Sequence, residues 1–149
     1  MLSLCVREPH IKKFMSKLFA QSMFDAFEVR GVSVTHFIKL DADGALTESG
    51  GKTFATWARL KPYIYHFIKG DVRPEYIKIV FSAPRGMLDG VAPNAAAAFL
   101  NMEYKDDAVR FTTATSQKEF SLSKEQDGLW DKYARKFFLL NGVAVEEES

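Results

Sequence analysis

Residues 99–115 read FLNMEYKDDAVRFTTAT and predict an antiparallel hairpin. The segments 99–104 and 108–115 are rich in aromatic, apolar and β-branched side chains, which suit the pleated surface of a sheet. Asp106 and Asp107 stand between them, where short acidic side chains favour a tight turn. Because strands joined by a tight turn are antiparallel, this stretch predicts an antiparallel sheet rather than a parallel sheet with crossover helices.

Further strands are expected on both sides of this hairpin. The apolar residues of 2–6 alternate with small polar ones, and residues 76–82 and 120–122 are also rich in strand-forming side chains. Residues 84–98 have no regular period and include four successive alanines. A loop with one helical turn is the expectation there, and its conformation is left open.

The longest strand pattern runs over residues 27–40. Its apolar period of two slips by one residue near Gly31, which predicts a β-bulge at that glycine. Asp43-Gly44 has the composition of a hairpin turn, so we expect a short return strand near residues 45–46.

Three amphipathic helices are predicted at residues 11–19, 54–69 and 124–140, where apolar residues recur at helical spacing. Pro62 is expected to kink or divide the second helix. Ser123 and Gln126 have the spacing of a capping box at the start of the third. Trp57 and Trp130 lie on the apolar stripes of their helices, which predicts that both are buried.

These elements predict an α+β fold, in which three amphipathic helices cover one face of an antiparallel sheet. Residues 1–145 are expected to form one globular domain, and residues 146–149 a disordered acidic tail. The single cysteine indicates a reducing compartment. With no signal-peptide core and no apolar run of about 18 residues, the expectation is a cytoplasmic protein without a membrane contact.

The chain shows no catalytic or metal-binding constellation at the sequence level. His10, His36 and His66 fall in three separate segments, without a second ligand or a carboxylate at the required spacing. Nothing near Cys5 in the sequence would lower its pKa, so it is expected to be a small buried apolar residue. We therefore expect no metal and no cofactor.

Two classes of function follow from this pattern. The favoured one is a non-enzymatic binding or scaffold domain that contacts a nucleic acid or a protein partner, with a homo-oligomer left open. The alternative is a small-molecule enzyme whose site is assembled from distant residues such as His36, His66 and Asp71.

Charge is balanced in total but not along the chain. There are 20 basic and 19 acidic residues, yet the segments 7–19, 52–69 and 124–136 hold twelve basic and only four acidic ones. Clustered cations bind a phosphate backbone through counterion release, so these helices are the expected nucleic-acid contact. A solvated helix surface is the simpler alternative. The candidate contact residues are Lys12, Lys13, Lys17, Arg59, Lys61, Lys69, Lys132, Arg135 and Lys136.

One resemblance covers nearly the whole chain. Its residues are Trp57-x-x-Leu60-x-Pro62, Ile68-Lys69-Gly70, the strand 77–81, the segment 112–116 and Trp130 with Lys136-Phe137-Phe138. In these the chain resembles an uncharacterised single-domain family of short proteins from anaerobic Gram-positive bacteria. The resemblance implies a single cytoplasmic domain of unknown function and adds no activity or site residues.

A second resemblance concerns the order of elements. A short strand, a helix, a long strand-turn-strand, a second helix and the meander 109–122 are similar to one domain of a DNA sliding clamp. The resemblance implies a sheet with helices facing the duplex, so the cations of 11–19 and 54–69 would face DNA. Clamp protomers contain two or three such domains, whereas this chain has one and adds the helix 124–140.

Overall fold

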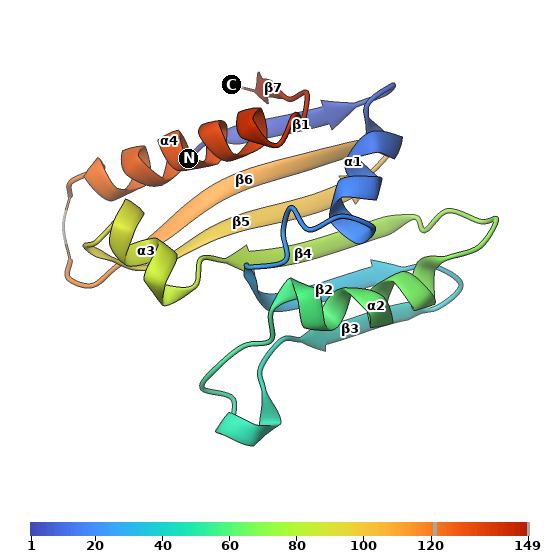
Figure 1. Ribbon diagram of the computed structural model, residues 1–149, viewed down its shortest axis with the longest axis horizontal. Helices are drawn as coiled ribbons and strands as arrows, with labels where there is room; N and C mark the ends of the chain where they lie inside the picture. Colours follow the sequence, from blue (N-terminus) through green and yellow to red (C-terminus); the bar gives the residue numbers. More distant parts are fainter. Residues whose placement is uncertain (121, 149) are drawn as a thin grey trace.

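A computed structural model describes residues 1–120 and 122–148. The described residues form a seven-stranded sheet in the order β3-β2-β4-β5-β6-β1-β7 (Figure 1). Every neighbouring pair of strands is antiparallel, so the predicted α+β fold with an antiparallel sheet is confirmed. The strands are β1 (Ser3–Arg7), β2 (Glu28–Thr35), β3 (Lys39–Asp43), β4 (Tyr76–Ser82), β5 (Ala95–Lys105), β6 (Ala108–Gln117) and β7 (Glu146–Glu148).

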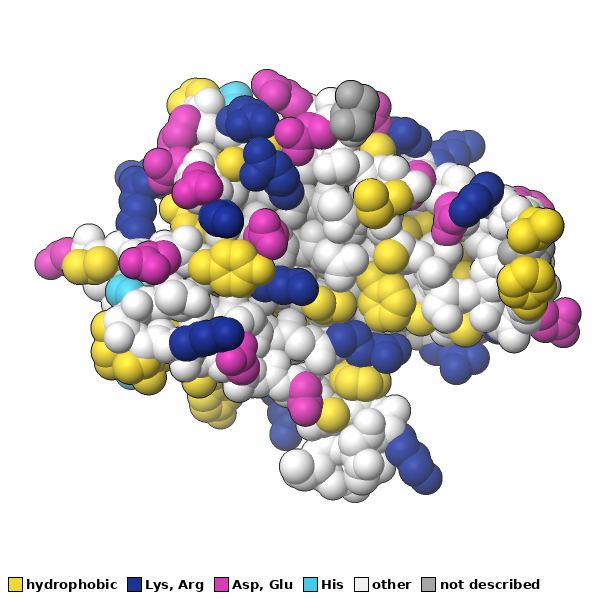
Figure 2. All heavy atoms as spheres, turned by 180° about the vertical axis from the view of Figure 1, so that it is seen from behind, with side chains coloured by type: hydrophobic (Ala, Val, Ile, Leu, Met, Phe, Trp, Pro, Cys, Tyr) yellow, Lys and Arg dark blue, Asp and Glu magenta, His cyan; other side chains and the backbone are white. Residues whose placement is uncertain are grey.

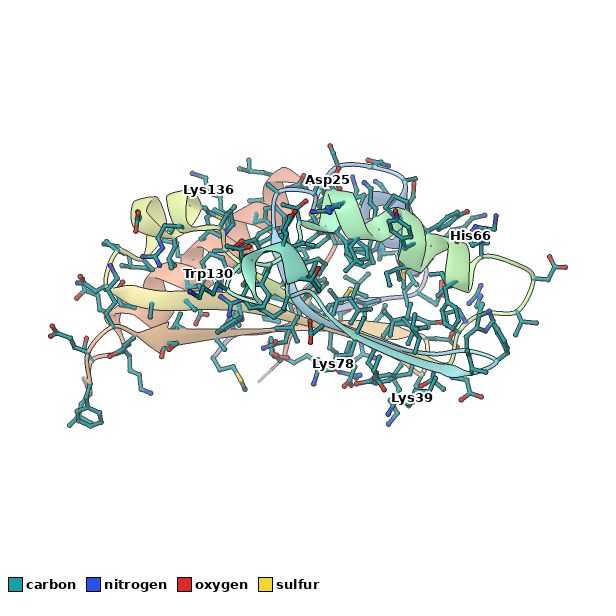
Figure 3. All side chains as sticks on the ribbon, turned by 90° about the horizontal axis from the view of Figure 1, so that it is seen from below. Asp25, Lys39, His66, Lys78, Trp130 and Lys136 are labelled. Carbon is teal, nitrogen blue, oxygen red and sulfur yellow. The ribbon has the colours of Figure 1, made fainter. Side chains whose placement is uncertain are left out.

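Within the described residues, four α-helices cover one face of the sheet and leave the other face open (Figures 1 and 3). They are α1 (Ile11–Phe19), α2 (Trp57–Ile68), α3 (Arg85–Val91) and α4 (Glu125–Leu140), and a short 3₁₀ turn covers Thr47–Ser49. Three of them match the predicted helices, and α3 lies within residues 84–98, where the sequence predicts a loop with one helical turn. The core lies between the helices and the sheet.

Two tryptophans anchor this core. Trp57 and Trp130 are both fully buried, as the apolar stripes predict. The indole N–H of Trp57 donates to the carbonyl oxygen of Leu18 at 2.8 Å, and that of Trp130 to the carbonyl oxygen of Phe99 at 2.9 Å. Because a buried N–H group without an acceptor is costly, these bonds fix how each helix sits on its neighbours.

The strand β2 carries the predicted bulge, because its register against β4 shifts between Val29 and Gly31. The predicted turn at Asp43-Gly44 is wrong: β2 and β3 are joined by a turn at residues 36–38. A Cβ atom at Gly44 would lie 1.7 Å from the carbonyl oxygen of Val29. This glycine therefore allows a close chain crossing. In place of the return strand predicted near residues 45–46, Ala45 forms an isolated bridge with Phe54.

Residues 84–98 are more regular than expected. They contain the helix α3 and, from Ala95, the first residues of β5, so the successive alanines belong to a strand. The short strand expected at residues 120–122 is not formed at Phe120 and Leu122, which are exposed, and Ser121 lies outside the described residues. Nor does Pro62 divide α2, which runs unbroken through it.

The start of α4 also differs in detail from the predicted capping box. The hydroxyl oxygen of Ser123 accepts the backbone N–H of Glu125 at 3.2 Å. The side chain of Gln126 is buried and accepts the backbone N–H of Asn94 at 3.1 Å. Gln126 thus ties α4 to the loop that precedes β5.

The acidic tail is a strand rather than the disordered segment expected. Glu146, Glu147 and Glu148 form β7, which pairs with Ser3, Leu4 and Cys5 of β1. The carboxylates meet arginines from three other elements, and these ion pairs offset the repulsion between neighbouring glutamates. Ser149 lies outside the described residues.

Candidate functional site

Three of the nine candidate cations are engaged with carboxylates of the same chain. Arg59 lies 3.4 Å from Glu48, and Arg135 pairs with Glu147 of β7. The Lys61 ammonium group lies 2.6 Å from Asp25 and 2.7 Å from the carbonyl oxygen of Gln21, and its side chain is only 16% exposed. Of these three, Lys61 is held in a largely buried contact, whereas the pairs of Arg59 and Arg135 are exposed.

The other six candidate cations have no ion pair among the described residues. They are Lys12, Lys13 and Lys17 of α1, Lys69 after α2, and Lys132 and Lys136 of α4. The structure brings two of them, Lys12 and Lys69, to the walls of one cavity.

This cavity has a volume of about 750 Å³ and opens between α1 and the carboxyl end of α2. Figure 3 marks that end of α2 with the label of His66. One wall is a face of α1, the opposite wall is Tyr65, Ile68 and the loop 69–74, and Ile77 and Tyr104 close the floor. A cavity of this size lies in the usual range for small-molecule pockets.

The walls are mainly apolar. Met15 and Phe19 flank the buried stripe of α1, and Ile68 ends the stripe of α2. All three are only partly buried and line the cavity, so part of each apolar side chain is left uncovered. The same helical spacing that builds the core therefore also supplies an apolar surface for a ligand.

The polar groups of the cavity are mostly cationic. Lys12, Lys69 and Arg73 line it, against the single carboxylate of Glu8. Asp107 lies beside the mouth, 3.7 Å from the Arg73 guanidinium, and accepts the hydroxyl of Tyr104 at 3.5 Å. Exposed ion pairs of this length are weak, so Arg73 can turn towards a ligand at little cost.

Sequence reasoning missed Arg73, Tyr65 and Tyr104 as members of a site. Arg73 belongs to a loop with no periodic pattern, and the two tyrosines come from a helix and a strand that are far apart in the chain. The only signal in the sequence was that Met15 and Phe19 lie at the margin of the α1 stripe.

The residues of the alternative enzyme site are not joined. The His36 ring packs against the rings of Phe37 and Phe67, with centroids 5.8 and 6.1 Å apart. Within the described part of the chain, no hydrogen bond or ion pair links His36 to His66 or Asp71. Likewise, the described residues contain no group of three His, Cys, Asp or Glu side chains placed to hold a metal ion.

Cys5 is fully buried, as predicted, but on the open side of the sheet rather than in the core. Burial raises the pKa of its thiol, and the nearby carboxylates of Glu148 and Glu146 act in the same direction, while Arg7 and Arg110 oppose them. A thiol with a raised pKa is a poor nucleophile at neutral pH.

The fold and the cavity define an α+β protein in which helices cover one face of an antiparallel sheet and two of them flank an open pocket. The chain belongs to a family of unknown function, DUF5721, whose model matches residues 17–146. No curated protein and no solved structure matches the chain. The expected uncharacterised family is thus confirmed, while its bacterial distribution and the clamp-like topology stay predictions.

None of the described helices combines the length and the apolar character that crossing a bilayer requires.

Proposed function

We propose that this protein is a non-enzymatic binding domain for a small amphipathic anion, a molecule with an apolar body and one carboxylate or phosphate group. The observation that carries the proposal is the cavity between α1 and α2, which combines apolar walls with Lys12, Lys69 and Arg73. The apolar body would lie against Met15, Phe19 and Ile68, and the anionic group at the cationic mouth.

The two parts of the pocket would contribute differently to binding. Burying apolar surface favours binding by about 25 cal/mol per Å², so most of the affinity would come from the ligand's apolar body. Exposed charge pairs contribute roughly 0–1 kcal/mol each, so the cations would select anionic over cationic ligands.

Calorimetric titration with three probes that each carry a ten-carbon chain tests this proposal. Decanoate and decyl phosphate should bind with one molecule per chain, at least tenfold more tightly than decyltrimethylammonium. Ser16 is exposed on the α1 wall, so Ser16→Trp should fill the cavity without disturbing the core and weaken decanoate binding at least tenfold. Equal affinity for the anionic and cationic probes would contradict the proposal.

A matched pair of charge reversals separates the pocket from the rest of the surface. Lys69→Glu combined with Arg73→Glu should weaken decanoate binding about tenfold. Lys132→Glu combined with Lys136→Glu, which reverses two exposed lysines on α4 that do not line the cavity, should leave it unchanged. If the α4 double variant has the same effect, the charge of the whole molecule rather than the pocket controls binding.

Contact with a nucleic acid is a second candidate function. It is supported by the six candidate cations without a carboxylate partner among the described residues, which lie in or directly after helices on one face of the sheet (Figure 3). Such a surface should bind duplex DNA weakly, without sequence preference, and with affinity that falls as salt rises.

Fluorescence anisotropy at about 50 mM salt, where phosphate contacts are strong, tests this candidate. Lys13→Glu with Lys17→Glu should weaken DNA binding and lower its salt dependence, and should leave decanoate binding unchanged because neither lysine lines the cavity. Absence of binding to duplex DNA, RNA and single strands would show that these lysines form a solvated surface.

A further inference from the structure

The edge of β1 carries a set of arginines that is arranged for an acidic strand. Arg7 lies in β1, Arg110 in the neighbouring strand β6 and Arg135 in α4. In the structure this edge is occupied by β7, and Figure 1 shows β7 beside β1 at the end of the sheet. Figure 2 shows cationic and anionic side chains intermixed over the same edge on the open face.

The three glutamates of β7 form ion pairs with arginines on both faces of the sheet. Glu146 and Glu148 lie opposite Cys5 and Ser3, so their side chains are on the open face with Arg7 and Arg110. Arg7 is 3.5 Å from Glu146 and 3.2 Å from Glu148, and Arg110 is 3.2 Å from Glu148.

Glu147 lies opposite Leu4, so its side chain is on the helix side, where it pairs with Arg135 of α4. Successive residues of a strand point to opposite faces, and each face of this edge has at least one arginine. The edge is therefore complementary to consecutive acidic residues in an extended conformation, rather than to a single anionic group.

The contact made by β7 is short and weak. It pairs with three of the five residues of β1, from Ser3 to Cys5, and leaves Val6 and Arg7 outside the pairing. Its ion pairs are exposed or only partly buried, and exposed pairs contribute roughly 0–1 kcal/mol each. A longer acidic strand could form the same ion pairs and extend the backbone pairing along β1.

We propose that the β1 edge, with Arg7, Arg110 and Arg135, is a docking site for an extended acidic segment of a partner protein, and that β7 occupies this site until the partner displaces it. The docked segment adds a strand to the sheet antiparallel to β1. Main-chain hydrogen bonds supply affinity, and the arginines select consecutive glutamates or aspartates.

The test uses the full chain and the peptide acetyl-TTVEEES-amide, with acetyl-TTVQQQS-amide as its uncharged counterpart. In the protein, Glu146→Gln, Glu147→Gln and Glu148→Gln together remove the competing charges without changing side-chain size. This triple variant should bind the acidic peptide at least tenfold more tightly than the wild type does. The uncharged peptide, which lacks the charges that the arginines select, should bind the triple variant at least tenfold more weakly than the acidic peptide does.

Cys5 provides an independent readout, because it is the only cysteine in the sequence, lies opposite Glu146 and is fully buried. Its labelling by a thiol reagent should be at least tenfold faster in the triple variant, and the acidic peptide should restore protection. Arg110→Gln in the triple variant should abolish peptide binding, whereas Arg73→Gln, at the mouth of the pocket, should not.

Equal peptide affinity for the wild type and the triple variant would overturn the proposal. So would a rate of Cys5 labelling in the triple variant that is the same with and without the peptide. A concentration-dependent dimer of the wild type that is lost in the triple variant, together with no peptide binding, would also overturn it. That result would assign the edge to the β7 strand of a second copy.

Discussion

Gly44 is the glycine at which a single added methyl group meets fixed backbone. A Cβ atom there would lie 1.7 Å from the carbonyl oxygen and 2.7 Å from the carbonyl carbon of Val29, and backbone cannot move aside as a flexible side chain does. Gly44→Ala should therefore destabilise the protein by about 3 kcal/mol, the upper end of overpacking costs. Urea unfolding measures the change.

Gly128 is the matched control, since it lies inside α4 and an added Cβ atom would meet nothing within 4 Å. Gly128→Ala should stabilise the protein by about 1 kcal/mol through helix propensity alone. If Gly44→Ala has the same urea unfolding midpoint as the wild type, the chain segments at Gly44 and Val29 must lie farther apart than the 1.7 Å contact implies.

At the scale of an element, α4 is fastened to the sheet by two carboxylates one helical turn apart. Asp127 accepts the hydroxyl of Thr115, and Asp131 accepts the hydroxyl of Thr113, both from β6. The hydroxyl oxygen of Thr113 in turn accepts the backbone N–H of Leu2 at 2.8 Å. One threonine thus joins the start of the chain, a central strand and the last helix.

Removal of one carboxylate from this network should be costly because Thr113 is buried. Asp131→Ala should destabilise the protein by about 2 kcal/mol, the usual range for a hydrogen bond to a charged group. Asp131→Asn retains an acceptor oxygen and should cost less than about 1 kcal/mol. Lys132→Ala, on the exposed side of the same helix, should change stability by less than about 0.5 kcal/mol. Equal losses in the two Asp131 variants would contradict the assigned bond.

At the scale of the whole molecule, stability should fall in alkaline solution. Burial raises the pKa of Tyr133 above its ordinary value of 10.0, and burial also raises the pKa of Cys5 above 9.0. The folded protein then keeps these protons where the unfolded chain releases them. Their contribution is therefore complete below the unfolded pKa values and is lost as pH rises through the folded ones.

Thermal unfolding between about pH 8 and pH 11, which spans the ordinary pKa values of cysteine and tyrosine, measures this loss. Tyr133→Phe should flatten the decline, because the variant has no phenol to ionise. Tyr63→Phe, at a side chain 73% exposed, should follow the wild-type curve. Parallel curves for all three proteins would show that Tyr133 ionises equally easily in the folded and unfolded states.

Local spacing along the chain was enough to predict much of the fold. The strand-turn-strand at residues 99–115, the bulge near Gly31 and the burial of Trp57 and Trp130 all depend on side chains within a few positions of one another. The same reasoning failed at Asp43-Gly44, because a turn and a close chain crossing both favour glycine, and only the position of Val29 distinguishes them.

The two proposed sites depend on contacts that no local pattern contains. The cavity brings Lys12 of α1 together with Lys69 and Arg73 of the loop after α2, and Ile77 of β4 and Tyr104 of β5 close its floor. The acidic residues 146–148 by themselves favour a solvated tail, since neighbouring like charges repel. They become a strand because folding places arginines from β1, β6 and α4 around them. Side-chain spacing thus determined the elements of this protein, and tertiary structure decided which charges meet, because charge pairing depends on distance in space rather than on separation in the chain.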